Sequence, residues 1–287
     1  SRLSIFINHA LQPFLCKICS FTKDTFNFLQ WLPKSLSPGS FLVTADVASL
    51  YTNISNDFGL CALQHWFQLY PELLITSSLF LLESVSFILE NNYFVSSNIV
   101  YRQRRDVAMG TNMAPTYANL VMGYLELKVQ QHPSVSSIPR HFFSHSYKRY
   151  IDDIFFIWHS QFIDFNIFLK TFSKISPDIT LTSQKSFSHI NFLDIVIVRD
   201  EQNFISTDVY FKSTNNFNYL SFRSLYPKHI IINVPYNIFN RVSKIVSNDS
   251  WLYFRFSQIY DIYISLGYPK HIIQNAMFKS LISLNKK

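Results

Sequence analysis

Apolar residues recur at helical spacing through residues 1–32, and a helical pattern returns from about Pro235 to the end of the chain. Between these regions, short apolar runs bounded by turn residues are typical of β-strands. We expect strands or hairpins over residues 41–47, 93–101, 147–158, 178–185 and 191–198, and a further strand that ends near 211. We expect helices over residues 57–70, 74–91, 116–129 and 161–174. This order predicts an α/β (α+β) core with a helical appendage.

The tetrapeptide Tyr150-Ile151-Asp152-Asp153 lies between two apolar runs, residues 147–151 and 154–158. Two strands joined at this point would hold two carboxylates at a tight turn. A pair of acids in such a place needs a cation to stay ionised. Aspartate also simply favours turns, so the tetrapeptide alone leaves both a turn and a metal site open.

A third acid, Asp46, comes near the end of the predicted strand 41–47. If this strand lies beside the hairpin, Asp46 converges with Asp152 and Asp153 on one point. Joining a nucleotide to a growing strand uses two divalent ions about 3.5–4 Å apart, held by carboxylates of neighbouring strands. A lone aspartate at a strand end is more often a turn former or a cap. Three acids in this order, with the loop at Gly110–Pro115 between them, favour the metal site.

The chain has 25 basic and 18 acidic residues, so its formal net charge is +7. This charge favours a polyanionic partner such as nucleic acid, although the basic residues are spread along the chain. The 29 Phe and 16 Tyr supply core volume and possible base-stacking surface.

Three cysteines argue against a disulfide framework and for a reducing, intracellular compartment. Cys16 and Cys19 have the spacing of half a zinc site, but only Cys61 remains elsewhere, so a structural zinc is not expected. The most membrane-like stretch, residues 73–89, carries Glu83 and several serines. It is therefore interpreted as a buried or amphipathic helix, and no membrane partner is expected.

Several ordered segments are similar to the motifs of a known family: residues 44–54 (TADVASLYTNI), 108–120 (AMGTNMAPTYANL), 149–155 (RYIDDIF) and 190–195 (INFLDI), with 226–229 (YPKH) and 234–236 (VPY) further on. Over nearly its whole length the chain resembles the reverse transcriptase core of Penelope-like retroelements. The resemblance implies a right-hand polymerase: a palm with an antiparallel sheet and packed helices, partial fingers and a helical thumb. The corresponding segments are 1–40 for a helical fingers remnant, 41–211 for the palm with finger-side helices, and 212–287 for the thumb.

The implied activity is RNA-directed DNA polymerisation, in which two Mg²⁺ ions (or Mn²⁺) assist the extension of a DNA primer with dNTPs on an RNA template. An intracellular, nuclear location would follow, whereas the oligomeric state stays open. The alternative is a truncated remnant that keeps the fold and binds nucleic acid without catalysis. A polymerase that makes RNA is a third possibility, but it predicts a small or polar residue in place of Tyr51.

The resemblance also assigns roles to individual residues. Asp46, Asp152 and Asp153 would bind the metal ions, and Tyr51 would exclude a ribose 2′-hydroxyl, although a core tyrosine is the competing interpretation. Lys185 would protonate the pyrophosphate leaving group, unless it is an exposed strand-end lysine. Gln103, Gly110, Ala114 and Pro115 would shape the substrate site. The residues expected to contact template, primer or phosphates are Arg104, Arg105, Lys212, Lys228, His229 and Arg241.

The chain departs from the family pattern at two positions. Asp106 stands where the family usually has Gly, and Ser213 stands where it usually has Pro. If that Gly takes a positive φ, an aspartate there costs free energy. The finger segments that precede this region in the family, and the nuclease domain that follows in many members, are not present in the sequence. We therefore expect a core-plus-thumb fragment.

Overall fold

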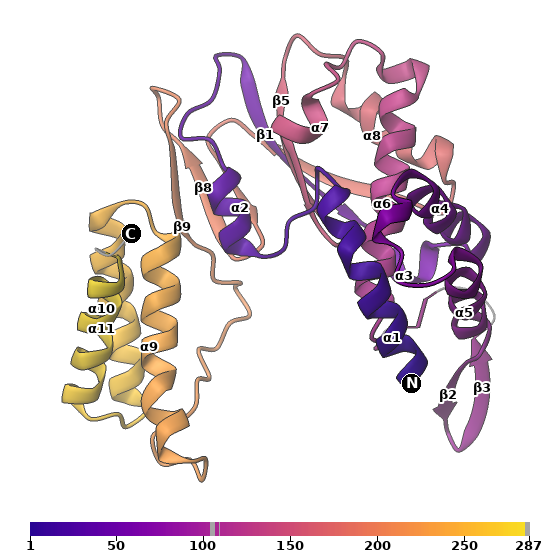
Figure 1. Ribbon diagram of the computed structural model, residues 1–287. Coiled ribbons are helices and arrows are strands. Elements are labelled where there is room, and N and C mark those ends of the chain that lie inside the picture. The colour runs from indigo at the N-terminus through magenta and orange to yellow at the C-terminus, as the bar shows by residue number, and fades with distance from the viewer. Residues whose placement is uncertain (104–106, 109, 285–287) are drawn as a thin grey trace. The chain divides into compact units, whose positions relative to one another are not determined.

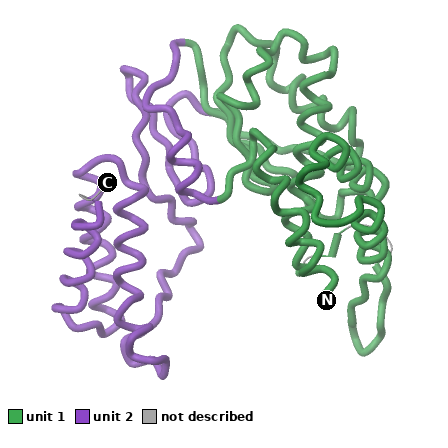
Figure 2. The backbone as a smooth tube through the Cα atoms, in the orientation of Figure 1, with its two compact units in different colours: residues 1–23, 39–185 green, residues 24–38, 186–287 purple. Residues whose placement is uncertain are grey.

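The computed structural model describes residues 1–103, 107–108 and 110–284 (Figure 1). The chain forms two compact units (Figure 2). Unit 1 comprises residues 1–23 and 39–185, and unit 2 comprises residues 24–38 and 186–287. These units differ from the segments 1–40, 41–211 and 212–287 that the resemblance implies, and the functional division into fingers, palm and thumb stays a prediction.

Unit 1 contains a four-stranded sheet in the order β4 (Tyr147–Tyr150), β5 (Asp153–His159), β1 (Ser40–Val47) and β6 (Leu181–Ser186). β5 pairs antiparallel with both β4 and β1. Burial is nearly continuous along β1, as its apolar run predicts, and Asp46 is the exposed position near its end. A separate hairpin, β2 (Asn92–Ser96) with β3 (Ile99–Gln103), has largely exposed side chains despite its apolar sequence.

The longest helix of unit 1 is α6 (Ala114–Gln131), which is buried on nearly every side. It begins with a proline in the first turn, a position where proline needs no hydrogen-bond donor. The other helical segments of unit 1 are α1 (Arg2–Leu11), η1 (Gln12–Lys17), α3 (Leu50–Asn53), α4 (Asn56–Leu69), η2 (Pro71–Leu73), α5 (Ser78–Glu90), η3 (Pro133–Val135), α7 (Phe142–His145) and α8 (Phe165–Ile175). In the part of the chain that the structure describes, no helix is both long and apolar enough to span a bilayer.

Unit 2 combines a three-stranded antiparallel sheet with helices. The sheet has the order β7 (His189–Phe192), β8 (Ile195–Arg199) and β9 (Ile205–Val209). α2 (Thr25–Trp31) packs on it through Phe28, whose ring centroid lies 4.6 Å from that of Phe192. α9 (Lys228–Ile245), α10 (Asp249–Ser265) and α11 (Lys270–Leu284) lie side by side (Figure 1).

Two expectations from the pattern are corrected within unit 2. The apolar run 191–198 is not one strand: it turns at Leu193, which has a φ of +53°, and divides into β7 and β8. Continuous apolar residues hide this turn because both strands bury side chains. The C-terminal helical region begins at Lys228 and not near Pro235, which lies inside α9.

Candidate functional site

The site begins at the hairpin that joins β4 to β5. Tyr150 and Asp153 are register partners, so Ile151 and Asp152 form a two-residue turn. Ile151 has a φ of +56°. In hairpins of this length, a positive φ at the first central position usually belongs to glycine, and a β-branched residue there is strained. The predicted Asp-Asp corner is therefore an Ile-Asp turn, with Asp153 as the first residue of β5.

The neighbouring strand brings Asp46 to this turn. Asp46 is the register partner of Asp153, and the Val47 amide donates to the Asp152 carbonyl over 3.1 Å. Partial burial and the nearby Asp152 carboxylate together raise the pKa of Asp46. The Asp152 carboxylate, far from Asp46 in the sequence, thus lies close enough to disfavour the charged form of Asp46.

Tyr51 stands beside the same turn. It belongs to α3, which starts after Ser49 in a left-handed conformation with a φ of +48°. Burial raises the pKa of the Tyr51 hydroxyl, and the charges of Asp152 and Tyr150 raise it further. The ring is half-buried against the core, so it combines a packed body with a polar end near the acids.

The loop before α6 contains the other predicted substrate residues of unit 1. Gly110 has a φ of +96°, and a Cβ built on it would meet no heavy atom of the described residues within 4 Å. Its backbone is therefore open to close approach by another molecule. Ala114 is buried at the start of α6, whereas Pro115 is exposed and Gln103 ends β3. The predicted contacts Arg104 and Arg105, and the unusual Asp106, lie outside the described residues.

Lys185 is not among the residues that the turn brings together. Its ammonium lies 5.5 Å from the ring centroid of Phe165 and 6.0 Å from that of Phe41. Phe41 precedes Asp46 by five positions on β1, which is about 16 Å along an extended strand. The ammonium therefore makes a cation–π contact near the other end of β1. Its predicted role as a general acid gains no support from this position.

The predicted nucleic-acid contacts of unit 2 differ in their surroundings. Lys212, Lys228 and His229 are exposed. Arg241 instead pairs with Asp194, to which its Nε donates over 2.8 Å. The other oxygen of Asp194 accepts from the Thr25 hydroxyl over 2.5 Å, so this carboxylate joins α2 and α9 to the β7–β8 turn. Arg241 thus has a structural partner, whereas the lysines and His229 point to solvent.

Within the described ranges, no group of three or more His, Cys, Asp or Glu side chains is arranged to hold a metal ion. The geometry supports a pair, Asp46 and Asp152, with Asp153 in register opposite Asp46. The convergence of all three carboxylates on one ion stays a prediction.

Residue-by-residue interpretation of the motifs missed a buried polar cluster behind the turn. Arg149 is fully buried on β4, and its Nε donates to Glu126 of α6 over 2.6 Å. Asn119, also on α6, accepts from the same guanidinium over 2.7 Å. Two signals could have indicated it: Tyr147 and Arg149 alternate on the inward face of a strand, and Glu126 interrupts the apolar run 120–127 within α6.

Solved structures place this architecture among known folds. An RNA-dependent RNA polymerase of a human picobirnavirus aligns with a TM-score of 0.56 at 13% identity, covering 94% of this chain and 54% of that one. Apo telomerase from Candida tropicalis aligns with a TM-score of 0.53 at 11% identity, covering 98% of this chain and 50% of that one. The chain is built as a right-hand polymerase fold of mixed helices and antiparallel sheets, as predicted. It spans about half the length of the solved structures it matches.

Comparisons of sequence add one partial match. The family model of an animal helix-turn-helix domain matches residues 218–278, a region that includes α9 and α10. No curated protein matches the chain.

Proposed function

We propose that this chain is the nucleotidyl-transferring core of an RNA-directed DNA polymerase, as its resemblance to the reverse transcriptases of Penelope-like retroelements implies. One observation carries the proposal: in a polymerase-like fold, Asp46 and Asp152 meet where β1 ends beside the β4–β5 turn. This is the arrangement of acids on adjacent strands that nucleotide addition requires. A nuclear location would agree with such an activity.

The residues at the turn fit a divalent cation. The side chain of Asp46 reaches solvent, and partial burial together with the nearby Asp152 carboxylate raises its pKa. A cation beside the two carboxylates would offset their mutual repulsion. Mg²⁺ prefers oxygen ligands and keeps several waters, so two carboxylates are a suitable protein contribution. Asp46 and Asp152 would hold it, with Asp153 as the third ligand, and Mn²⁺ would suit the same oxygens. Such ions stabilise negative charge on the attacking and leaving oxygens of the transferred phosphoryl group.

The other residues of the site then have separate tasks. Tyr51 stands beside Asp152, where its ring would meet the sugar of an incoming nucleotide and select dNTPs. Gly110 leaves its backbone open to a close approach by the nascent base pair. The exposed side chains of Lys212, Lys228 and His229 would contact phosphates of primer or template without sequence preference.

Primer extension on an RNA template with dNTPs and Mg²⁺ tests the proposal. We expect the wild-type chain to extend a labelled primer and Asp152→Asn to lose at least about a hundredfold in rate, since it removes a metal-binding charge. Asp178→Asn, an exposed acid elsewhere in unit 1, is the matched control and should extend as the wild type does. Equal extension by the wild type and Asp152→Asn would overturn the assignment of the site.

The second candidate is a non-catalytic chain that binds nucleic acid. The net charge of +7 and the helix-turn-helix match over residues 218–278 favour it. The same experiment separates the two functions: no extension by either chain, together with retained binding of an RNA–DNA duplex, would establish the non-catalytic one. A retained activity that depends on Asp152 would exclude it.

A further inference from the structure

The turn that presents Asp152 is held in a conformation that its sequence disfavours. Ile151 has a φ of +56°, in the left-handed region that β-branched residues rarely adopt. A conformation of this kind persists only where the surroundings fix it. The structure therefore contains contacts that hold this turn, and some of them come from residues outside the acidic pair.

One of these contacts comes from Arg149. Its Nη1 donates to the Ile151 carbonyl over 2.9 Å, two residues further along the chain. The same nitrogen donates to Asn119 Oδ1 over 2.7 Å, and Nη2 donates to the Asn119 carbonyl over 3.2 Å. The guanidinium thus connects the first residue of the turn to helix α6, and its planar group of donors suits several acceptors at once.

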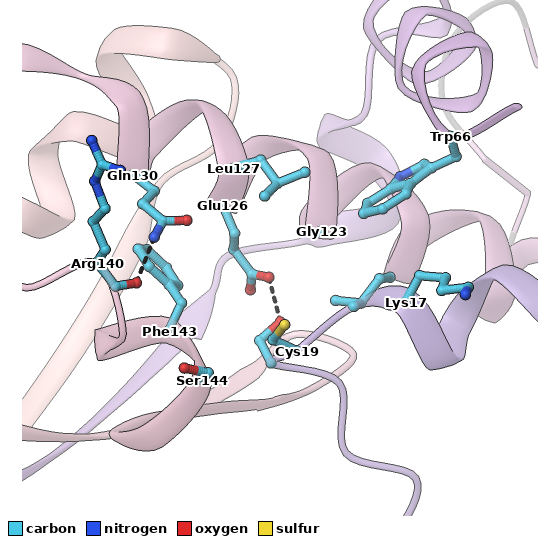
Figure 3. Close-up of a pocket in the computed structure, with 12 residues that line it drawn as sticks. Lys17, Cys19, Trp66, Gly123, Glu126, Leu127, Gln130, Arg140, Phe143 and Ser144 are labelled. Carbon is cyan, nitrogen blue, oxygen red and sulfur yellow. Dashed lines mark hydrogen bonds between the residues drawn. The ribbon is translucent and has the colours of Figure 1, made fainter. Parts of the chain in front are cut away.

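Glu126 fixes the other side of the guanidinium. Its Oε1 accepts from Arg149 Nε over 2.6 Å, and both side chains are buried. Its Oε2 accepts from the Ser20 hydroxyl. Glu126 and Ser20 both line a pocket of about 130 Å³. Figure 3 shows the Glu126 carboxylate directed toward the segment that contains Cys19.

The backbone of Arg149 is held as firmly as its side chain. Its amide donates to the Ser20 carbonyl over 2.7 Å, and its carbonyl accepts from the Thr22 amide over 2.8 Å. Both ends of the residue are therefore fixed, so a displacement of the turn would have to break the hydrogen bond to Ile151. The opposite side of the turn is held by the Val47 amide, which donates to the Asp152 carbonyl over 3.1 Å.

We propose that Arg149 is a positioning residue: by holding the Ile151 carbonyl, it fixes the left-handed turn and sets where the Asp152 carboxylate stands relative to Asp46. This inference rests on the proposed function for its kinetic consequence, but its structural content does not. Arg149 is fully buried, so its effect passes through Ile151 and the backbone of the turn.

If Arg149 only neutralised the buried charge of Glu126, replacing it would have a different effect. A buried ion pair whose one member is removed leaves an uncompensated charge, so Arg149→Met alone would destabilise unit 1 for reasons unrelated to the turn. The double variant Arg149→Met with Glu126→Gln removes both charges and keeps an oxygen for Ser20. If Arg149 only neutralised Glu126, this double variant would behave as the wild type does.

Three readouts test the proposal: urea unfolding, the kcat and KM of primer extension, and amide hydrogen exchange of Val47 and Ala48. The Ala48 amide donates to the Thr180 carbonyl and not to the turn, so it is the internal control. In the folded double variant we expect Val47 exchange to rise at least about tenfold and Ala48 exchange to stay unchanged. We expect kcat to fall about a hundredfold, as for a small misplacement of a reacting group, and the KM for dNTPs to stay within about threefold.

The matched control is Glu126→Gln alone. It also leaves one buried charge without its partner, so urea unfolding should show a loss of stability. It keeps the Arg149 contact to Ile151, so the folded variant should stay within about threefold of the wild-type kcat. A folded double variant with wild-type kcat and wild-type Val47 exchange would overturn the proposal. If the double variant does not fold, Arg149→Lys, which keeps a positive charge opposite Glu126, takes its place under the same criteria. If the wild type itself shows no extension, the proposed function fails, while Val47 exchange still decides whether Arg149 holds the turn.

Discussion

Replacing Gly59 with alanine sets two effects against each other in α4. Glycine in a helix interior is less favourable than alanine by about 1 kcal/mol, so propensity alone predicts that Gly59→Ala stabilises the protein. The structure predicts the reverse. A Cβ at this position would lie 1.6 Å from the hydroxyl oxygen of Tyr117 and 2.5 Å from the ring carbon that carries it. Neither separation is possible between unbonded atoms.

The side chain of Tyr117 has little room to retreat. It is fully buried in α6, and burial raises the pKa of its hydroxyl. Forcing an extra carbon into a well-packed core costs about 1–3 kcal/mol. A contact this short belongs at the upper end of that range, which exceeds the gain of about 1 kcal/mol from helix propensity. We therefore expect Gly59→Ala to lower the free energy of unfolding by about 2 kcal/mol.

Urea unfolding of a double-mutant cycle measures this directly. Tyr117→Phe removes the atom that makes the shortest contact, and that hydroxyl has no hydrogen-bond partner among the residues described. Gly59→Ala should therefore cost at least about 1 kcal/mol less when it is combined with Tyr117→Phe than when it is made alone. If Gly59→Ala is as stable as the wild type or more stable, the packing of α4 on α6 described above is wrong.

Three further predictions concern other parts of the chain. Tyr51→Ala should raise ribonucleotide incorporation about tenfold relative to dNTPs, because it opens space for a 2′-hydroxyl; an unchanged ratio would remove the sugar-gate role. Lys228→Ala and Lys270→Ala should each lower the slope of log K against log salt for duplex binding by about 1, with folding unchanged; slopes equal to the wild type would show that these lysines contact no phosphate. Burial and the nearby Lys128 lower the pKa of His65. As the pH falls, His65 therefore takes up its proton at a higher pH in the unfolded state than in the folded state, so the free energy of unfolding should decrease below about pH 6.5. His65→Phe should weaken this pH dependence, as measured by urea unfolding at several pH values.

Local patterns in the sequence were sufficient for most elements of unit 1. The strand that carries Asp46 is a continuous apolar run, and Pro115 indicates where α6 begins. The hairpin at Asp152 was predicted because two apolar runs flank a turn-forming pair. In each case the signal lies within a few residues of the element it specifies, and the fold class followed from the order of these elements.

The contacts that hold the turn could not be obtained in this way. Glu126 and Arg149 are separated by 23 positions, and Ser20 lies 106 positions before Glu126. No local pattern specifies which buried acid meets which buried base. The same limit applies to Lys185: nothing near it in the sequence indicates that its ammonium lies over Phe165, and its role as a general acid, which the resemblance implies, stays a prediction.

A repeated hexapeptide within unit 2 shows which features follow from the local sequence and which depend on tertiary contacts. Tyr-Pro-Lys-His-Ile-Ile occurs at 226–231 and again at 268–273, immediately before and at the start of α9 and α11. Both copies start a helix after the proline, and in both the fourth residue after that proline is a buried isoleucine, Ile231 or Ile273.

The hydrogen bonds of the two copies also correspond. In each, the proline carbonyl accepts from the amides three and four residues later, at 2.9 and 3.3 Å in the first copy and at 3.0 and 3.4 Å in the second. The start of each helix and its buried face are therefore set by the hexapeptide itself.

The tyrosines of the two copies do not correspond. Tyr226 is 60% exposed, whereas Tyr268 is 3% exposed and its hydroxyl lies within hydrogen-bond distance of two carbonyls, at 2.9 Å from that of Leu220 and 3.2 Å from that of Ile231. Since the six residues of the two copies are identical, this difference comes from the neighbours that the fold supplies. The first copy is itself the neighbour of the second, because Tyr268 packs against the first turn of α9. Among the described residues of unit 2, no other helix start packs against Tyr226 in the same way. The starts of α9 and α11 consequently lie at the same end of the helices (Figure 1). Each start carries an exposed lysine and histidine of the hexapeptide, which is why Lys270 belongs beside Lys228 in the test of duplex binding.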